Sequence, residues 1–198
     1  SLEDIYQRHN QELRKIRKFI RKKGASCQFE KLYLATVEDY LEKGDMALGL
    51  LRDSAYSKLR QDVTENGWIC HGEYNQHNVL MIRKETAVTS FEHWGFDMQM
   101  ADLYRFMRKI LEKYNWDVRL GMKMLSAYHK EKSISEDEWQ NIRIRFLYPE
   151  KYWKLANYYY SHNKAWISEK NTQKLKKLTG QKEAWQNFGT KCLENYPF

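Results

Sequence analysis

Apolar side chains recur at helical spacing over most of the chain. The strongest stretch is 98–114, where the apolar positions follow an i, i+3, i+4 pattern, as one face of an amphipathic helix requires. These positions are Leu103, Phe106, Met107, Ile110, Leu111 and Tyr114. Comparable patterns predict further helices over about 5–23, 29–43, 46–63, 117–128, 136–146 and 171–193, and one that begins near Pro149.

Glycine and capping residues predict where several of these helices begin and end. Gly24 is a suitable C-cap for the first helix, and Gly44 is expected to end the second. Asp45 then stands where it can cap the third helix. Ser135 and Glu138 have the spacing of a capping box, in which two side chains satisfy two free backbone amides.

The pattern changes between residues 68 and 90. Short apolar runs at 68–70, 79–82 and 87–89 are separated by polar segments, which is typical of β-strands. The runs are too short for a sheet-based domain, so we expect a small ribbon that carries loops. The predicted fold class is therefore mainly α with one short β element.

Composition favours one folded domain. The chain has 198 residues, of which 42% are hydrophobic and 15% aromatic, and a disordered chain would not carry so many aromatic side chains. It has no long uncharged apolar run, so no membrane-spanning helix is predicted, and its acidic start is unlike a secretory signal. The odd number and wide spacing of Cys27, Cys70 and Cys192 predict free thiols in a reducing compartment.

The chain is basic, with a formal net charge of +8. Such an excess permits an acidic partner, and one alternative function is a basic helical nucleic-acid-binding module. The lysines and arginines are spread along helical segments, however, as at 14–23 and 174–177. This distribution is typical of solvated helix faces, so nucleic acid is not the expected partner.

The segment with the most specific chemistry lies in the β-type region, at residues 70–80. It places an acid, Glu73, two positions after His71, and an asparagine, Asn78, five positions after the acid. This is the layout of a kinase catalytic loop, in which the acid orients the attacking hydroxyl and the asparagine holds a magnesium ion at the phosphates. A following strand would then deliver a further carboxylate to the metal.

The loop resembles the His-Gly-Asp-x-x-x-x-Asn motif of aminoglycoside phosphotransferase-like kinases, and the chain resembles more closely the CotS-type spore coat protein family, which has a kinase-like fold. The segments that carry the resemblance are HGEYNQHN at 71–78, DLYRFMRK at 102–109, YPEKYWK at 148–154 and NKAWI at 163–167. The first motif is shared widely among small-molecule kinases, whereas the last two look specific to spore coat proteins. The resemblance covers about residues 12–186 and implies the helical C-terminal lobe of a kinase-like fold.

The chain departs from the motif at its catalytic positions. Glu73 stands where the motif has Asp, and a misplacement of its carboxylate by about an ångström can cost roughly a hundredfold in rate. Ser90 stands where the family has a metal-binding Asp before Phe-Glu, and a neutral hydroxyl is a poor ligand for a hard cation. Asn78 is intact, and Glu92 is an alternative metal ligand if Ser90 and Glu92 share one face of a strand.

The chain also lacks the features of a nucleotide-binding lobe. No Gly-rich loop or strand lysine precedes His71, and no Gly-x-Gly occurs. We therefore expect residues 1–198 to form a single kinase-like C-terminal lobe, without the nucleotide-binding N-terminal lobe. Such a lobe is not expected to be an active enzyme by itself, and no cofactor is expected for it.

The resemblance implies a function in the bacterial spore. The leading expectation is a spore coat protein of the CotS type, a pseudokinase with a structural or scaffold role in coat assembly. It implies other spore coat proteins as partners, no membrane partner, and a location in the mother-cell cytoplasm and then in the spore coat. The alternative is an active small-molecule or sugar phosphotransferase of the aminoglycoside-kinase class, with ATP and magnesium as cofactors of the full-length protein.

Other interpretations of the loop residues are weaker. Cys70, His71, Glu73, His77 and His93 are of types that bind zinc, but their spacing does not match the usual pairs of a zinc finger. If Cys70 and His71 lie on a strand, their side chains also point to opposite faces. We expect His71 to pack and organise the loop instead.

Asp102 lies near the start of the 98–114 helix. A carboxylate is favoured there by the helix dipole. The resemblance implies a further role, because in kinase-like folds this Asp accepts hydrogen bonds from backbone amides of the catalytic loop. Both interpretations make Asp102 a structural support.

Aromatic and basic residues gather between residues 148 and 166, which could suit a carbohydrate or a nucleic acid. Helical spacing favours a buried stripe instead, formed by Tyr152, Leu155, Ala156 and Tyr159. Tyr158 and Tyr160 fall off this stripe and are expected to be exposed.

Overall fold

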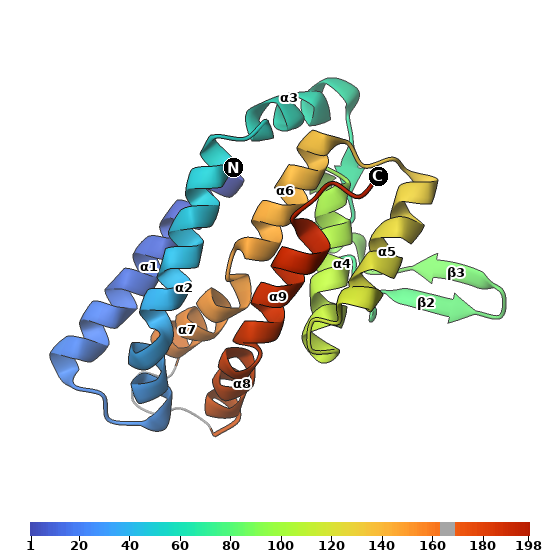
Figure 1. Cartoon of the computed structure of the whole chain (residues 1–198). Coiled ribbons are helices and arrows are strands. Elements are labelled where there is room, and N and C mark those ends of the chain that lie inside the picture. The colour runs from blue at the N-terminus through green and yellow to red at the C-terminus, as the bar shows by residue number, and fades with distance from the viewer. Residues whose placement is uncertain (163–168) are drawn as a thin grey trace. The chain divides into compact units, whose positions relative to one another are not determined.

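The computed structural model describes residues 1–162 and 169–198 (Figure 1). Within these ranges the α-helices are α1 Leu2–Lys23, α2 Gln28–Arg52, α3 Tyr56–Asn66, α4 Met100–Lys113, α5 Val118–Glu131, α6 Glu136–Leu147, α7 Glu150–His162, α8 Glu169–Gly180 and α9 Lys182–Leu193. The strands are β1 Ile69–Cys70, β2 Val79–Ile82, β3 Glu85–Val88 and β4 Gly95–Phe96, and a short 3-10 helix, η1, spans Phe91–His93. The predicted fold class, mainly α with a small β element, is confirmed.

The chain divides into two compact units. Unit 1 comprises Ser1–Arg52 and Leu147–Glu183, and unit 2 comprises Asp53–Phe146 and Ala184–Phe198. Unit 1 holds α1, α2, α7 and α8. Unit 2 holds every strand of the described residues together with α4 and α5, so it also holds the loop in which the sequence places the chemistry.

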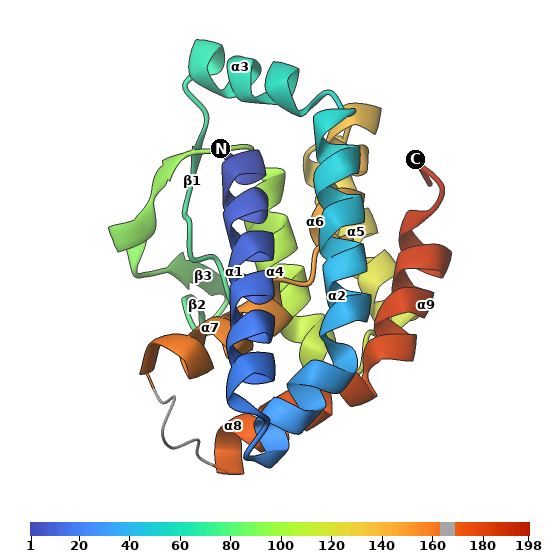
Figure 2. The same cartoon turned by 90° about the vertical axis from the view of Figure 1, so that its left-hand side faces the viewer.

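Helices α1 and α2 run side by side in unit 1 (Figure 2), with α7 against α1 and α8 against both α2 and α7. Buried tyrosines connect these helices. The Tyr33 hydroxyl donates to the Leu13 carbonyl at 2.9 Å, and the Tyr152 hydroxyl donates to the Tyr33 carbonyl at 3.2 Å. Because a buried hydroxyl needs a partner, these bonds fix how the aromatic side chains pack.

Glu30 of α2 is a buried carboxylate, with only 1% of its surface exposed. Lys23 lies 2.7 Å from it, the Tyr159 hydroxyl donates to it at 2.5 Å and the Ser26 amide donates at 2.7 Å. Burial alone raises the pKa of a carboxyl group, but the hydrogen bonds from these three residues outweigh burial and lower the pKa of Glu30 to about 2. The buried charge is thus fully partnered, as its position in the core requires.

Helix α2 runs through Gly44, so the prediction that Gly44 ends one helix and Asp45 caps the next is wrong. Gly44 is a packing position, because a Cβ there would lie 2.7 Å from Asn10 Oδ1 of α1. Asp45 accepts hydrogen bonds from Asn10 and Arg14 of α1, at 3.0 and 2.5 Å. The absence of a side chain at Gly44 leaves room for the side-chain amide of Asn10 between the two helices, and a glycine used in this way looks like a helix end in the sequence.

The predicted helix 171–193 is also wrong, because it is divided into α8 and α9. Helix α8 ends at Gly180, and the Gln181 amide donates to the carbonyls of both Lys177 and Leu178 at 3.2 Å. Such a shared hydrogen bond tightens the last turn of a helix, and glycine is a weak helix former. The break therefore falls where the helical hydrogen bonding is least favourable.

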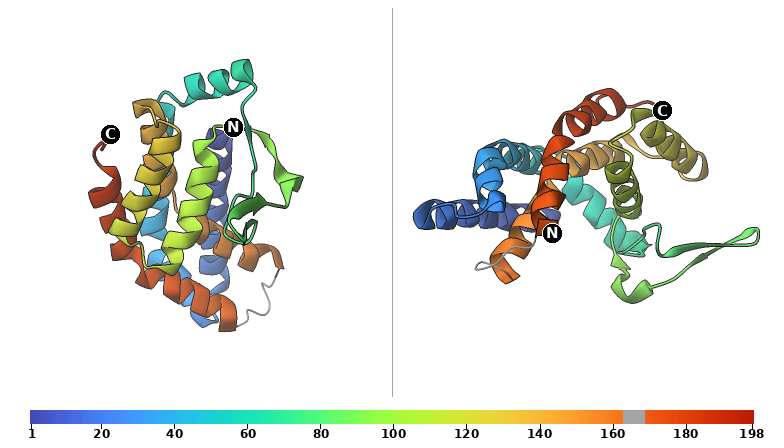
Figure 3. Two further views of the ribbon diagram at one scale, coloured as in Figure 1. Left: turned by 90° about the vertical axis from the view of Figure 1, so that its right-hand side faces the viewer. Right: turned by 90° about the horizontal axis from the view of Figure 1, so that it is seen from below.

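In unit 2, α4 and α5 pack against each other (Figure 3). Asn115 and Trp116 in the turn between them both have positive φ, 48° and 57°. The buried Trp116 ring lies 6.2 Å from that of Phe146 and 5.6 Å from that of Phe188. A positive φ is unfavourable for residues with a side chain, so the packing of Trp116 compensates for the strained turn.

The β element consists of two separate antiparallel pairs, β1 with β4 and β2 with β3. Ile69 pairs with Phe96 in the first, and Val79 pairs with Val88 in the second. Strand β4 was not predicted, because two residues give no periodic pattern. The β2–β3 hairpin extends outward from α4 and α5 (Figure 3), and Met81 on it is 73% exposed.

Several smaller predictions are confirmed. The Glu138 amide donates to Ser135 Oγ at 3.2 Å and the Ser135 amide donates to Glu138 Oε2 at 2.9 Å, which is the predicted capping box. Gly24 is the C-cap of α1, with φ of 82°. Cys27, Cys70 and Cys192 are all free thiols. In the described ranges, no helix has the length and apolar character needed to cross a membrane.

The aromatic stripe of α7 is largely as predicted. Its members Tyr152, Leu155, Ala156 and Tyr159 are buried. Tyr158 is 45% exposed, as expected, but Tyr160 is half-buried with its ring 5.6 Å from that of Phe19. Trp166 and the rest of the motif at 163–167 lie outside the described residues.

The two glycines of α2 provide a matched test of the packing between α1 and α2. We expect Gly44→Ala to destabilise the protein by about 1–3 kcal/mol, because the new methyl group would overlap the Asn10 amide. We expect Gly49→Ala to stabilise it by about 0.4–1 kcal/mol, because no atom lies within 4 Å of a Cβ there. Urea unfolding of both variants measures the difference. Equal effects of the two substitutions would contradict the close approach at Gly44.

Candidate functional site

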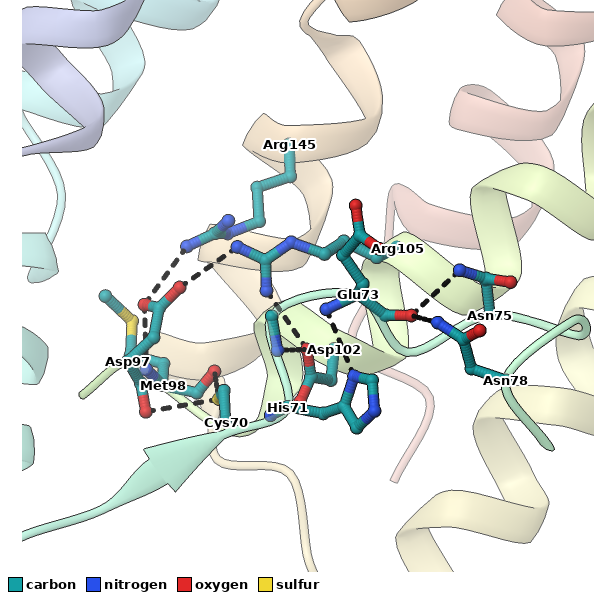
Figure 4. A network of polar contacts seen from close by, with 11 residues as sticks. Cys70, His71, Glu73, Asn75, Asn78, Asp97, Met98, Asp102, Arg105 and Arg145 are labelled. Atoms are coloured by element: carbon teal, nitrogen blue, oxygen red, sulfur yellow. Dashed lines mark hydrogen bonds and ion pairs between the residues drawn. The ribbon is translucent and has the colours of Figure 1, made fainter. Parts of the chain in front are cut away.

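A single carboxylate holds the loop between β1 and β2. Asp102 lies in the first turn of α4. Its Oδ2 accepts the His71 amide at 2.6 Å, and its Oδ1 accepts the Gly72 amide at 3.1 Å (Figure 4). This is the arrangement that the resemblance implies for Asp102. Charge-assisted hydrogen bonds of this kind are stronger than neutral ones, so the start of the loop is firmly positioned.

Asp102 belongs to a chain of alternating charges (Figure 4). Arg105 Nη1 donates to Asp102 at 3.1 Å, and Arg105 Nη2 lies 3.3 Å from Asp97, whose other oxygen lies 3.9 Å from Arg145. Burial alone lowers the pKa of Arg105, but the carboxylates of Asp97 and Asp102 raise it above its ordinary value. Arg105 therefore stays charged and keeps both carboxylates in place.

Cys70 ends strand β1 directly before the loop. Its Sγ donates to the carbonyls of Asp97 and Met98, at 3.3 and 3.1 Å. Burial, with the charges of Asp102 and Asp97, raises the pKa of the Cys70 thiol to about 12. Because the thiolate is the form that binds metals and attacks electrophiles, Cys70 is a structural residue.

His71 uses both ring nitrogens within the fold. Its Nδ1 accepts the Glu73 amide at 3.2 Å, so the ring proton is assigned to Nε2, which donates to the Thr89 carbonyl at 2.8 Å. The ring also packs 4.5 Å from that of Phe91. Both nitrogens are thus used within the fold, which argues against the zinc interpretation of His71.

The backbone carbonyl of Glu73 accepts hydrogen bonds from the two asparagines of the loop. Asn75 Nδ2 donates to it at 2.8 Å and Asn78 Nδ2 donates to it at 3.0 Å. The Glu73 side chain is 52% exposed, and its carboxylate lies 3.8 Å from His93 Nε2. His77 lies at the end of the loop, where its backbone amide donates to Asn75 Oδ1 at 2.9 Å. The side-chain Nδ2 of Asn78 therefore helps to hold the loop, while its side-chain Oδ1 is the atom that a kinase loop would use for the metal.

Ser90 adopts a left-handed backbone conformation, with φ of 65°, immediately before η1. The strand assumed for 90–92 is therefore wrong. In a 3-10 helix, positions i and i+2 do not share a face, so the argument that Glu92 replaces Ser90 on the same face does not hold. The left-handed conformation is one that Asp and Asn tolerate better than most residues.

The side chains at these positions do not fit a magnesium ion well. Asn78 and Ser90 offer neutral oxygen atoms, whereas protein sites for magnesium use one or two carboxylates. Among residues 1–162 and 169–198, no group of three or more His, Cys, Asp and Glu side chains could hold a metal. Asn78 and Ser90 therefore supply no anionic oxygen atom of the kind that magnesium sites in proteins use.

Sequence reasoning did not assign roles to Asp97, Arg105, Arg145 and Asn75. Asn75 had a local signal, because an asparagine that accepts the amide two residues later forms an Asx turn. Arg105 also had one, because it follows Asp102 by three positions, which is the spacing of an ion pair on a helix. The contact between Asp97 and Arg145 joins segments that are far apart in the chain, and no sequence period indicates it.

Residues 3–192 match the model of the family described as "Spore coat putative kinase YutH". Spore coat protein S of Bacillus subtilis (strain 168) is 24% identical to this chain over 170 residues, which are 85% of this chain and 48% of that protein. The predicted family relationship to spore coat proteins is confirmed.

The crystal structure of the aminoglycoside phosphotransferase from Alicyclobacillus acidocaldarius subsp. acidocaldarius DSM 446 is similar with a TM-score of 0.88. The sequence identity is 19%, over 96% of this chain and 57% of that one, so the likeness shows a shared kinase-like fold. The chain spans about half the length of these relatives.

The role of Asp102 can be tested by removing its carboxylate. We expect Asp102→Ala to destabilise the protein by about 1–3 kcal/mol, because the amides of His71 and Gly72 lose their acceptor. Amide hydrogen exchange should also accelerate at these two residues. Glu131→Ala is the matched control, because Glu131 is exposed and has no polar partner among the described residues. Unchanged exchange at His71 and Gly72 in Asp102→Ala would contradict the role.

Gly72 offers a separate test of the loop geometry. Its φ is 82°, and a Cβ there would lie 1.9 Å from the His93 carbonyl oxygen. Gly67 has a similar φ of 65°, but no atom lies within 4 Å of its Cβ position. We expect Gly67→Ala to cost about 1–2 kcal/mol of folding free energy and Gly72→Ala roughly twice as much, measured by thermal unfolding. Equal costs would show that Gly72 and His93 are not in close contact.

Proposed function

Since the chain belongs to the family described as "Spore coat putative kinase YutH", we propose that it acts as a spore coat protein of the CotS type. Its role is structural, as a pseudokinase scaffold in coat assembly. Its partners are other spore coat proteins, and it is located in the mother-cell cytoplasm and later in the coat. The name of the B. subtilis relative, spore coat protein S, supports this assignment.

The observation that supports the pseudokinase role is a contrast between the residues that hold the loop and the residues at its catalytic-type positions. The residues that hold the loop in place, Asp102 and His71, keep their hydrogen bonds. The positions that would do chemistry have changed to Glu73 and Ser90. A fold maintained for catalysis would retain an acid at the metal position, because magnesium at the phosphates neutralises the charge that develops during transfer.

Binding of magnesium and ATP separates a pseudokinase from an active phosphotransferase. We expect the isolated chain to show no magnesium-dependent ATP binding in calorimetry. In the full-length protein, we expect Glu73→Asp with Ser90→Asp to strengthen binding of magnesium and ATP, because Asp at position 90 adds an anionic ligand. Asp also tolerates the left-handed backbone found there.

The matched control combines Glu73→Asp with Ser90→Asn. Asn has the size of Asp and tolerates the same backbone conformation, but it has no charge. Strengthening in the control as well would show that shape and not charge is responsible. Micromolar, magnesium-dependent ATP binding by the unmodified full-length protein would contradict the proposal, and would favour an ATP-dependent phosphotransferase with Glu73 as base.

A further inference from the structure

A cavity of about 720 Å³ opens beside the loop in unit 2. Its polar lining comes from the loop, from the end of α4 and from the start of α5: Gln76, Lys113, Tyr114, Asp117, Arg119 and Lys123. We call it the basic cavity. None of the positions discussed for phosphotransfer, Glu73, Asn78 or Ser90, lines it. Its volume falls in the range that holds a small organic ligand.

The basic cavity carries an unbalanced positive charge. Lys113, Arg119 and Lys123 have no ion-pair partner among residues 1–162 and 169–198. The only acidic residue in the lining is Asp117, which caps α5 by accepting the Leu120 amide at 2.7 Å. Cations that converge without partners repel one another, so an anion bound among them would relieve that repulsion.

The position of Arg119 in α5 is also unfavourable for its charge. It lies in the first turn of α5, where the helix dipole disfavours a cation. The turn before α5 is fixed by the buried Trp116, so α4 and α5 hold Lys113 and Arg119 at one opening. An anion bound beside Arg119 would offset the unfavourable placement of its charge.

Gln76 in the lining of the basic cavity has an unsatisfied hydrogen-bond acceptor. Its Oε1 is buried and has no hydrogen-bond partner, while its Nε2 lies 3.0 Å from His77 Nε2. A buried acceptor without a donor is unfavourable, and a ligand hydroxyl would satisfy it. Tyr114, which is 64% exposed, adds an apolar ring face at the same opening.

We propose that the basic cavity binds a small phosphorylated sugar or polyol. The phosphate group lies among Lys113, Arg119 and Lys123, and a hydroxyl group of the ligand donates to Gln76 Oε1. This site is independent of the proposed function, because it uses none of the altered catalytic positions. Polycations such as aminoglycosides are excluded by the same three charges.

Calorimetry with the full-length protein and glucose 6-phosphate tests the proposal. We expect millimolar or tighter binding that weakens as salt is added, weaker binding of inorganic phosphate, and none of glucose or kanamycin. The order follows from the two parts of the site, since inorganic phosphate lacks the hydroxyl groups of the sugar and glucose lacks the charge. Binding of glucose as strong as that of glucose 6-phosphate would overturn the proposal, as would absence of glucose 6-phosphate binding.

Variants assign the binding to the basic cavity. Lys113→Gln, Arg119→Gln and Lys123→Gln together should weaken glucose 6-phosphate binding by roughly tenfold or more. The control combines Lys174→Gln, Lys176→Gln and Lys177→Gln in α8, which removes the same charge from lysines that are also exposed. The control should bind within about twofold of the unmodified protein. Equal losses in both variants would show a general charge effect and overturn the site.

A single change tests the contribution of the hydroxyl group. Gln76→Met keeps the side-chain length and removes the acceptor, so it should weaken glucose 6-phosphate binding and leave phosphate binding unchanged. Thermal unfolding of each variant confirms that it is folded. If duplex DNA binds to the cavity residues while glucose 6-phosphate does not, the ligand is a nucleic acid and the proposal is wrong.

Discussion

The loop of unit 2 depends on one interaction, the acceptance of two backbone amides by the Asp102 carboxylate. The His71 and Gly72 amides would otherwise lie partly buried without a partner, at a cost of about 1–3 kcal/mol each. With these amides fixed, the His71 ring reaches the Thr89 carbonyl and connects the loop to the segment before η1. The position of the loop thus follows from a side chain in the first turn of α4.

This support does not depend on the chemistry that such a loop performs in a kinase. Asp102 is held by Arg105, and Arg105 by Asp97, through ion pairs that make no use of a nucleotide or a metal. A loop can therefore keep its conformation after its reactive side chains change. Glu73 and Ser90 are consistent with that separation, since neither takes part in the contacts that hold the loop to α4.

The sequence predicts the helices well, because amphipathic stripes repeat over several turns, as in the α4 segment. Prediction from the sequence fails where the structural role of a residue does not follow from its type. Gly44 resembles a helix end but allows a close helix contact, and Ser90 resembles a strand residue but has φ of 65°. The kinase-type loop was recognisable from spacing alone, whereas Asp97 and Arg145 meet through a tertiary contact that leaves no local pattern.

The proposed function requires that the loop keeps a kinase-type geometry without phosphotransfer. The most direct measurement is the turnover of ATP by the full-length protein with magnesium and candidate sugar and polyol acceptors. Phosphorus NMR monitors the products. The account predicts no ADP or phosphorylated acceptor beyond spontaneous hydrolysis. Turnover at about 1–100 per second, as typical kinases show, would contradict it and would make Glu73 a working base.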